Sequence, residues 1–378
     1  MGIKITIGGD FFVSPDYLSE NLFSDDLIQL FNESDINVVN LESPVISSKI
    51  KEKIAKSGPS LHTNNQIFKQ LKKLRINVVT LANNHILDYC SEGVHNTINE
   101  CKQHSILTTG VGENIKSASE TLFIEKNGSR IAFVNFCENE FSIATENVAG
   151  ANPLDIINNL AQIKAAKAKA DYVIVIIHGG HEYYNLPSPR MVKQYRFFAE
   201  NGADVVVGHH THCISGFEIH KQIPIFYGLG NMIFTQHSSE NGWYTGLLLK
   251  LELIKGTPVK WELIPIKQSE KNFFVSGVNG IENEKIMKEI SSYSFTIIDS
   301  ELLYKSWQKY IQTKETQYLN VFSPINLVPG RYLRAILRRM GMNNFIFRKK
   351  YVIPILNSIV CEAHHDLSRA ILHSKIKK

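Results

Sequence analysis

The residues best suited to chemistry form a histidine cluster with the sequence Val207-Gly208-His209-His210-Thr211-His212. In an extended or loop backbone, alternate residues project to the same side, so the rings of His210 and His212 can reach one centre. His209 would then face elsewhere, as a packing or supporting residue. Because neutral imidazole is the commonest protein ligand for metal ions, the cluster predicts a metal site.

Four polar clusters upstream add carboxylate, amide and imidazole groups, and each directly follows a run of apolar, often β-branched residues. They are Asp10, Asn40-Leu41-Glu42, Asn83-Asn84-His85 and His178. Each has a structural explanation when taken alone: a turn-capping Asp, a solvent-facing Glu, an Asn-rich turn capping a helix at Ser91, or a structural His. Strand ends in an open α/β sheet converge on one crevice, however, so the five clusters together favour a binuclear metal site.

The third cluster also offers a proton donor. Asn84 carries an amide oxygen that can bind a hard metal ion, while the neighbouring His85 can face the substrate. An imidazole titrates near neutral pH, so His85 can protonate a leaving group as a general acid. Asp88 lies three residues further on and can orient that imidazole.

Alternating strand and helix patterns must position these clusters, and they indicate βαβ units with a mostly parallel sheet. Strands are expected over residues 3–7, 37–41, 78–82, 172–177 and 204–207. Helices are expected over residues 25–31, 65–74, 91–104, 153–170 and 190–200. Hairpins are expected over residues 121–136, 217–227 and 245–266, the first turning at Asn127-Gly128. This mixture predicts an α/β fold with two facing sheets flanked by helices.

The composition of the sequence changes near Lys267. Polar content rises from there on, and the candidate metal-ligand clusters do not continue. We therefore expect one domain over residues 1–266 and a largely helical, basic extension over residues 267–378. Residues 332–340 interleave arginine with apolar side chains at helical spacing. Such a helix can contact an anionic membrane surface or a polymer synthase. The general behaviour of charged helix faces favours the alternative, a helix packed on the core with its basic face in water.

Composition limits the class of protein and its compartment. The net charge of +5 is too small to indicate nucleic acid as a partner. Five dispersed cysteines without a C-x-x-C pair are typical of a reducing compartment. Neither a signal-peptide pattern nor a run of about 18 to 20 apolar residues is found. The expected location is the cytoplasm, with a peripheral position at the inner face of the membrane as a possibility.

A wider set of motifs surrounds these clusters within residues 1–266: Gly9-Asp10, Asn40-Leu41-Glu42, Leu81-Ala82-Asn83-Asn84-His85, Asp88 with Gly93, His178-x-Gly180-x-Glu182-Tyr183, Gly202-Ala203-Asp204, Gly208-x-His210-x-His212 and Tyr227-x-Leu229-Gly230-Asn231. In identity and spacing this set resembles the bacterial capsule-synthesis proteins of the CapA (poly-γ-glutamate) family. That family looks like a branch of the calcineurin-like metallophosphoesterases. The resemblance implies a four-layer α/β/β/α sandwich with the site at the carboxyl edge of the sheets.

The resemblance also implies roles for single residues around two divalent ions, which would be Mn, Fe or Zn. Asp10 and His212 would bind the first ion, Glu42 would bridge both ions, and the second ion would be bound by Asn84, His178 and His210. His85 would be the general acid, with Asp88 beside it. Candidates for supporting the ligands or contacting the substrate are Asn40, Asn83, His181, Glu182, His209 and Asn231.

Two residues depart from the phosphoesterase pattern. Phe12 stands where an Asp-x-His motif would place a ligand, and Glu42 replaces the usual bridging Asp. The main hypothesis is a metal-dependent hydrolase in capsule, exopolysaccharide or poly-γ-glutamate biosynthesis, with phosphoric esters as the favoured class of substrate. A metal-bridged hydroxide would attack a small molecule or polymer precursor. The alternatives are a non-catalytic accessory protein of a surface-polymer synthesis or export complex, and a metal enzyme acting on an amide or γ-glutamyl bond.

Overall fold

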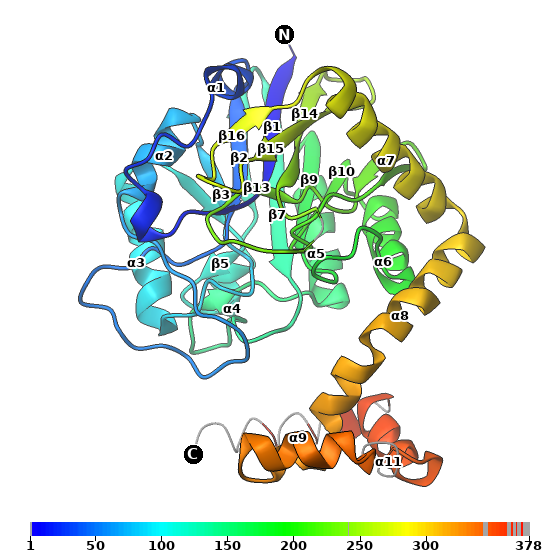
Figure 1. The fold of residues 1–378 in the computed structure, drawn as a ribbon. Coiled ribbons are helices and arrows are strands. Elements are labelled where there is room, and N and C mark those ends of the chain that lie inside the picture. Colours follow the sequence, from blue (N-terminus) through cyan, green and yellow to red (C-terminus); the bar gives the residue numbers. More distant parts are fainter. Residues whose placement is uncertain are drawn as a thin grey trace. The chain divides into compact units, whose positions relative to one another are not determined.

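The computed structural model describes residues 2–240, 242–342 and 347–360, together with residues 364, 365, 368 and 372. It divides into two units, Met1–Leu303 and Tyr304–Lys378 (Figure 1). The boundary expected at residue 266 falls inside strand β15 (Lys260–Gln268). The first unit extends further because strand β16 (Val275–Gly277) pairs with β15, and helix α7 (Gly280–Ile298) buries Ile286 and Ile290 in its core.

One sheet of the first unit has eight strands in the order β16-β15-β14-β1-β2-β3-β4, with β13 also paired to β1. Its parallel strands are β1 (Ile3–Phe12), β2 (Ile36–Leu41), β3 (Val78–Thr80), β4 (Leu107–Thr109) and β13 (Asn231–Phe234). Strand β14 (Thr245–Leu253) runs antiparallel to both β1 and β15. The expected hairpin over residues 245–266 is therefore present, and it extends the parallel sheet.

The other sheet has six strands in the order β11-β12-β10-β9-β7-β6. They are β6 (Leu122–Lys126), β7 (Ser129–Cys137), β9 (Tyr172–His178), β10 (Val205–His209), β11 (Phe217–His220) and β12 (Ile223–Phe226). The hairpin β6–β7 turns at Asn127 and Gly128, where φ is 49° and 75°. Positive φ at both central residues is the signature of the expected type I′ turn. A short pair, β5 (Val111–Gly112) with β8 (Gly150–Ala151), completes the strands.

Three cores confirm the four-layer α/β/β/α arrangement. The middle core joins the two sheets, with Ile5 and Ile7 from β1 packed in one cluster with Ile174 from β9. Helices α1 (Asp25–Asn32), α2 (Ile67–Lys73) and α3 (Cys90–Gln103) cover the outer face of the larger sheet. Helices α5 (Ile156–Lys167) and α6 (Pro189–Glu200) cover the outer face of the smaller sheet. A short helix, α4 (Ile115–Ala118), lies beside β5.

The C-terminal region is helical, as expected. Helix α8 (Ser300–Phe322) leaves the first unit and is followed by a 3₁₀ turn, η2 (Pro324–Leu327), and by helices α9 (Arg331–Arg339) and α11 (Lys349–Val360). Among the described residues, every helix is too short or too polar to span a lipid bilayer. Cys361 lies outside the described residues, and the four other cysteines are unpaired thiols.

Candidate metal centre

Asp10 lies inside β1 rather than in a loop after residue 7, where the sequence placed it. The pairing of β1 with β2 shifts register between Ile7 and Asp10, so the strand bulges at its two glycines and then continues. Gly9 permits this because a Cβ atom at its position would lie 1.8 Å from the carbonyl oxygen of Gly230. The close approach brings β13 alongside β1, and Asn231 becomes the direct neighbour of Asp10.

The other expected residues do lie at the carboxyl ends of strands. Glu42 directly follows β2, His178 is the last residue of β9, and His210 follows the end of β10. Asn84 lies in the loop after β3. This loop does not cap α3, because the residue at the N-cap is Tyr89 and it makes no side-chain capping bond. The two sheets thus deliver their polar side chains to one common edge.

One group of ligand atoms surrounds His178. Its Nε2 lies 3.1 Å from Asn84 Oδ1, 3.0 Å from His210 Nδ1 and 3.7 Å from Glu42 Oε1. Two ligands that each lie about 2.1 Å from one ion, at a right or tetrahedral angle, are about 3.0–3.4 Å apart. The spacing around His178 therefore suits a single divalent cation bound between the two sheets.

A second group shares Glu42 with the first. Asp10, Glu42 and His212 each offer one atom within 4.8 Å of the others. His212 Nε2 lies 3.6 Å from Glu42 Oε1, which is the same oxygen that faces His178. Glu42 is therefore placed to bridge two cations, as the resemblance implies.

The loop that carries His210 and His212 is not extended. Both residues have a left-handed backbone, with φ of 87° and 53°. Non-glycine residues adopt this conformation at an energetic cost, and such strain is concentrated at functional sites. The expected convergence of the two rings is present, although strained dihedral angles rather than strand alternation produce it. One anchor of the loop is the backbone N–H of His210, which donates to Asp10 Oδ2 at 3.0 Å.

The two buried carboxylates of the site would be stabilised by a bound cation. Burial raises the pKa of Asp10 to about 6, and burial together with the neighbouring Asp10 raises the pKa of Glu42 well above its usual value. Burial also lowers the pKa of His178 and takes that of His212 to about 3, so these rings are neutral. Neither carboxylate oxygen of Glu42 meets a hydrogen-bond donor among the described residues. Divalent cations at this position would satisfy those oxygens and stabilise both carboxylates, so the residues fit the implied metals.

Asn40 and Asn83 support the ligands. The side-chain amide of Asn40 donates to Asp10 Oδ1 at 2.8 Å and lies 3.1 Å from His178 Nδ1, so it positions one ligand from each sheet. The amide of Asn83 donates to Asn40 Oδ1 at 3.2 Å and to the carbonyl of Leu41 at 2.9 Å. Both residues lie where the sequence predicted, and both act through hydrogen bonds within the protein.

Asn231 orients His212. Its amide nitrogen donates to the carbonyl of Trp243 at 2.9 Å, which turns its amide oxygen toward His212 Nδ1, 2.9 Å away. The proton of the ring therefore lies on Nδ1, and Nε2 is left free to bind a cation beside Glu42. Hydrogen bonds of this kind fix the tautomer and orientation of ligand histidines.

His85 and Asp88 form the expected pair, with Asp88 Oδ2 2.7 Å from His85 Nδ1. A residue that sequence reasoning missed completes the cluster: Lys56 donates to Asp88 Oδ1 at 2.6 Å, and its ammonium lies 3.2 Å from His85 Nδ1. Asp88 also accepts a 2.7 Å bond from the backbone N–H of Leu61. Lys56 belongs to a lysine-rich loop without periodicity, so nothing in the sequence distinguished it from its neighbours.

Three other candidates lie outside the ligand groups. His209 is fully buried, with Nδ1 3.7 Å from Asp10 Oδ1, and burial lowers its pKa to about 3. His181 is half-buried and Glu182 is exposed. The charge of Glu182 reaches the site, because it adds to burial and Asp10 in raising the pKa of Glu42. None of the three belongs to a group of side chains that could hold a metal among the described residues.

An aromatic wall, defined by Phe12, Phe234 and Trp243, borders the first ligand group. The ring of Phe12 packs on Phe234 with centroids 4.9 Å apart. The ring of His212 lies 4.9 Å from Phe234 and 5.0 Å from Trp243. Position 12, from which one more ligand could come, is therefore apolar and packed against other rings. In the sequence, only the identity of Phe12 indicated this.

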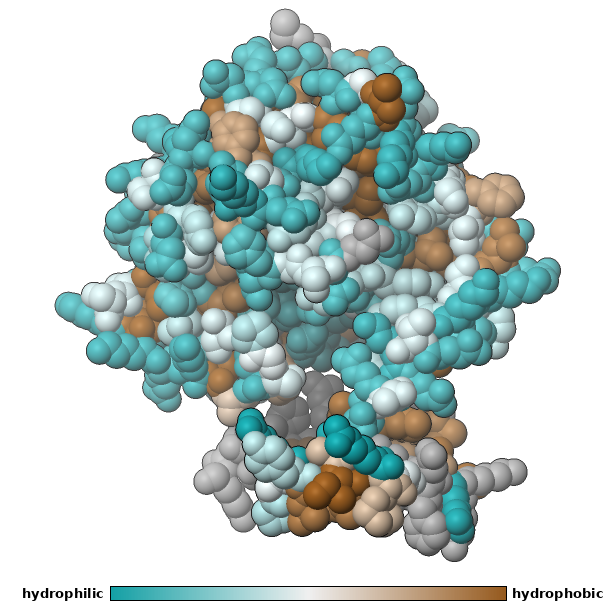
Figure 2. Space-filling model, viewed as in Figure 1, coloured by the Kyte–Doolittle hydropathy of each residue, from teal (hydrophilic) through white to brown (hydrophobic). Residues whose placement is uncertain are grey.

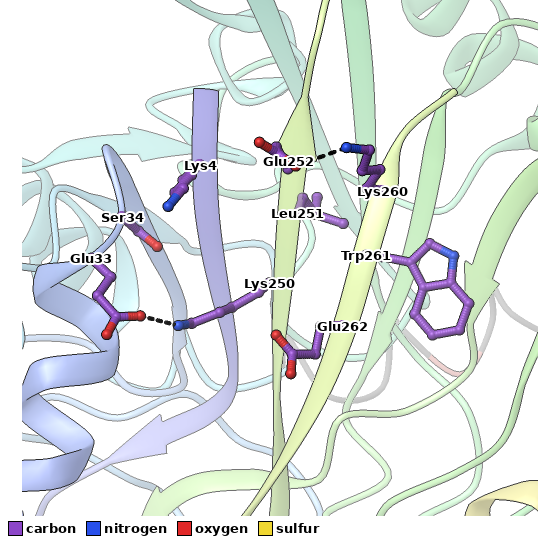
Figure 3. A pocket seen from close by; sticks show the side chains of 9 residues that line it. All are labelled: Lys4, Glu33, Ser34, Lys250, Leu251, Glu252, Lys260, Trp261 and Glu262. Atoms are coloured by element: carbon purple, nitrogen blue, oxygen red, sulfur yellow. Dashed lines mark hydrogen bonds and ion pairs between the residues drawn. The ribbon is translucent and has the colours of Figure 1, made fainter. Parts of the chain in front are cut away.

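A hollow of ≈ 400 Å³ lies away from this centre, over the outer face of β1, β14 and β15 (Figure 3). Its lining includes Lys4, six residues before Asp10 in β1, which places it roughly 20 Å from the metal ligands. Four of its charged side chains form ion pairs: Lys250 binds Glu33 at 2.6 Å, and Lys260 lies 3.4 Å from Glu252. We assign it no part in the chemistry.

The family model described as "Bacterial capsule synthesis protein PGA_cap" matches residues 8–236. The chain is 30% identical over 284 residues to the PGA biosynthesis protein CapA of Bacillus subtilis, covering 73% of each chain. It is 34% identical over 212 residues to the capsule biosynthesis protein CapA of Bacillus anthracis, covering 54% of this chain and 50% of that one. It is 26% identical to a probable polyglutamine synthesis accessory protein of Mycobacterium tuberculosis, covering 53% and 56%.

Solved structures give a more distant likeness. A novel phosphatase from Mycoplasma pneumoniae aligns with 72% of this chain and 96% of its own, at a TM-score of 0.44 and 15% identity. A putative 5'-nucleotidase from Staphylococcus aureus aligns with 77% of this chain and 58% of its own, at a TM-score of 0.45 and 12% identity.

Proposed function

The chain belongs to the bacterial capsule synthesis protein (PGA_cap) family, and from that premise we propose that it is a binuclear metal-dependent hydrolase of surface-polymer biosynthesis. Its substrate would be a small molecule or polymer precursor of a capsule, an exopolysaccharide or poly-γ-glutamate. Two relatives whose names refer to capsule or PGA biosynthesis support the pathway. A phosphoric ester is the bond that the ligand set favours.

The observation that carries the proposal is the sharing of Glu42 Oε1 between two groups of buried ligands, 3.7 Å from His178 and 3.6 Å from His212. Asp10, Glu42 and His212 would hold one ion, and Glu42, Asn84, His178 and His210 the other. Bound divalent ions would supply Lewis acidity and lower the pKa of a water molecule to near neutrality. Mn²⁺, Fe²⁺ and Zn²⁺ all suit this mixture of carboxylate, amide and imidazole ligands.

His85 would deliver the proton that a leaving group needs. Its Nδ1 lies 2.7 Å from Asp88, which holds the ring in one orientation with Nδ1–H toward the carboxylate. Nε2 would face the leaving group, and the doubly protonated ring would carry the transferred proton on that atom. Lys56 and the backbone N–H of Leu61 keep Asp88 in place from its other sides. A positioned acid of this kind contributes roughly 10²–10⁴-fold to the rate.

The aromatic wall favours a second candidate, a non-catalytic accessory protein of a polymer synthesis or export complex. Phe12 leaves the first ion with three protein ligands and an apolar neighbour, which suits weak or exchangeable binding. A relative named as a probable polyglutamine synthesis accessory protein supports the same direction. The buried pair of His85 and Asp88 supports catalysis instead, because a scaffold gains nothing from a proton donor beside its ligands.

Metal analysis combined with an activity assay tests the proposal. We expect two ions per chain after dialysis against Mn²⁺, together with hydrolysis of an activated phosphodiester. His85→Ala should keep the metal and lose turnover, whereas His210→Ala should lose metal. A content of one ion per chain, together with no turnover on any ester, would favour the accessory role instead. Turnover of an activated γ-glutamyl amide in place of the ester would support amide chemistry at the same centre.

A further inference from the structure

The second unit carries a surface that the metal centre does not use, formed by the exposed sides of α9 and α11. In α9, at about 100° per residue, the apolar and basic side chains fall on opposite arcs of about 140° each. The apolar arc consists of Tyr332, Leu333, Ile336, Leu337 and Met340, and the basic arc of Arg331, Arg334, Arg338 and Arg339. Because apolar and basic side chains are fully separated on α9, we expect the two arcs to contact different chemical environments.

The apolar arc is exposed in the described part of the second unit. None of the residues of α9 is buried. Tyr332 is 70% exposed, Ile336 53% and Met340 71%. Figure 2 shows brown apolar side chains beside teal hydrophilic ones on this part of the chain. Large exposed apolar side chains gathered on one helix face mark a contact surface.

Helix α11 adds further exposed apolar side chains. Ile353, Leu356 and Ile359 follow one another at intervals of three residues and are 54%, 54% and 47% exposed. No charged residue occurs between positions 351 and 361, while Arg348, Lys349 and Lys350 directly precede this stretch. Exposed apolar residues and basic residues thus occur together in the segment that contains both helices.

The charge of this segment identifies the partner. Residues 316–361 contain no Asp or Glu, and their basic residues are Arg331, Arg334, Arg338, Arg339, Arg348, Lys349 and Lys350. Arg334 and Arg338 donate to neutral oxygens, the carbonyl of Val328 and the side-chain amide of Asn326, so these contacts leave their charge uncompensated. The partner must therefore offer negative charge and an apolar layer together.

From this combination we propose that α9 and α11 form a docking surface for an anionic lipid bilayer, on which the protein binds peripherally. The apolar arc would enter the boundary between head groups and acyl chains, and the arginines would contact lipid phosphates. A soluble polyanion would leave Tyr332, Ile336 and Met340 without a partner. A second copy of this segment would bring arginine against arginine, with no carboxylate in residues 316–361 to pair across the contact.

Sedimentation of the 378-residue chain with lipid vesicles tests the proposal. We expect the protein to pellet with vesicles that contain about equal parts of phosphatidylglycerol and phosphatidylcholine, and to stay in solution with phosphatidylcholine alone. Raising the salt from about 0.1 M to about 0.5 M should weaken the binding, because the electrostatic part is screened. Absence of binding to the anionic vesicles would overturn the proposal.

Two variants separate the apolar and basic contributions. Ile336→Glu should weaken partitioning at least tenfold, since the apolar side chain no longer enters the bilayer. Its matched control is Ile281→Glu, at a residue of α7 that is 86% exposed, which should bind like the wild type. Arg338→Gln combined with Arg339→Gln should weaken partitioning about thirtyfold. Lys72→Gln with Lys73→Gln, at exposed residues of α2, controls for lost charge.

Two further outcomes would contradict the lipid surface. Unchanged vesicle binding by Ile336→Glu, with loss of binding only in the arginine variant, would indicate a purely electrostatic site for a soluble polyanion. A dimer that Ile336→Glu dissociates, without vesicle binding by either form, would indicate self-association. Circular dichroism of each variant ensures that lost binding does not reflect unfolding.

Discussion

At the scale of the residue, the chemistry of the centre depends on two buried carboxylates, Asp10 and Glu42, for which burial is the largest influence on the pKa. Asp10 and Glu42 face the neutral imidazoles of His178 and His212, and burial raises the pKa of both carboxylates. Bound metal ions would remove the cost of ionising both carboxylates. The first ligand group has the fewest protein ligands, because Phe12 occupies the position from which one more could come.

Phe12→His tests this reading of the first ligand group. Residues 10 and 12 of β1 project to the same side of the strand, so an imidazole at position 12 would lie beside Asp10. We expect the affinity of the more weakly bound ion to rise about tenfold, as other ligand-shell changes do. Isothermal titration with Mn²⁺ measures it. Phe12→Leu is the control, and equal affinity in both variants would show that position 12 does not reach the ion.

Lys56→Met tests the cluster around His85. Lys56 and Asp88 form a buried ion pair with side-chain exposures of 4% and 0%, so removing the cation leaves an unpaired buried carboxylate. We expect a loss of about 3 kcal/mol in the free energy of unfolding, measured with urea. Lys53→Met, in the same loop but exposed over the ring of Tyr89, should cost under about 1 kcal/mol. Equal losses would mean that Lys56 does not support Asp88.

At the scale of the element, the bulge in β1 sets the position of Asp10. The strand must pass Gly230 at a distance that excludes a side chain, and only then does β13 bring Asn231 beside Asp10. Asn231 in turn orients His212 from the other sheet. A strand irregularity of one or two residues therefore organises the whole first ligand group.

Gly9→Ala should disrupt this arrangement, because its Cβ atom would meet the backbone oxygen of Gly230 at 1.8 Å. Backbone cannot yield as a flexible side chain can, so we expect a loss of about 3 kcal/mol or more in stability together with reduced metal content. Gly8→Ala is the matched control. Its Cβ would lie 3.2 Å from the sulfur of Met232 and from a methyl of Val39, which can adjust. Thermal unfolding and metal analysis of both variants decide the question.

At the scale of the whole molecule, the ligands come from both sheets of the sandwich. Asp10, Glu42 and Asn84 lie on or after strands of the larger sheet, and His178, His210 and His212 on or after strands of the smaller one. Bound cations would thus add a link between two layers that already share an apolar core and hydrogen bonds such as that between Asn40 and His178. Metal occupancy and global stability should be coupled.

Metal removal measures that coupling. At a free Mn²⁺ concentration of about 100 times Kd, binding to the folded state alone contributes about 2.7 kcal/mol. For a unit of this size we expect the unfolding temperature to fall by about 5 °C when a chelator removes the metal. His210→Ala should show a much smaller change under the same conditions. An equal change in that variant would mean that the chelator acts elsewhere.

The sequence by itself determined the alternation of strands and helices, the type I′ hairpin at Asn127 and Gly128, and the residues proposed as the ligand set. These features depend on local periodicity, on backbone preferences of single residues, and on motifs whose spacing a family shares. The two-sheet architecture followed from the same patterns, because apolar strands and amphipathic helices leave few ways to bury their faces. His85 and Asp88, three residues apart, also belong to this local category.

Only the tertiary structure decided which residues support the ligands. Lys56 and Trp243 act through neighbours that are distant in sequence, and neither occurs in a pattern that predicts such contacts. The extension of the first unit to Leu303 depends on β16 and α7 closing against sheets already formed. The outward apolar arc of α9 was likewise undecided, because a helical pattern records that a face is apolar but not what covers it. Contacts across long sequence separations depend on the packing of the entire fold, which local patterns do not contain.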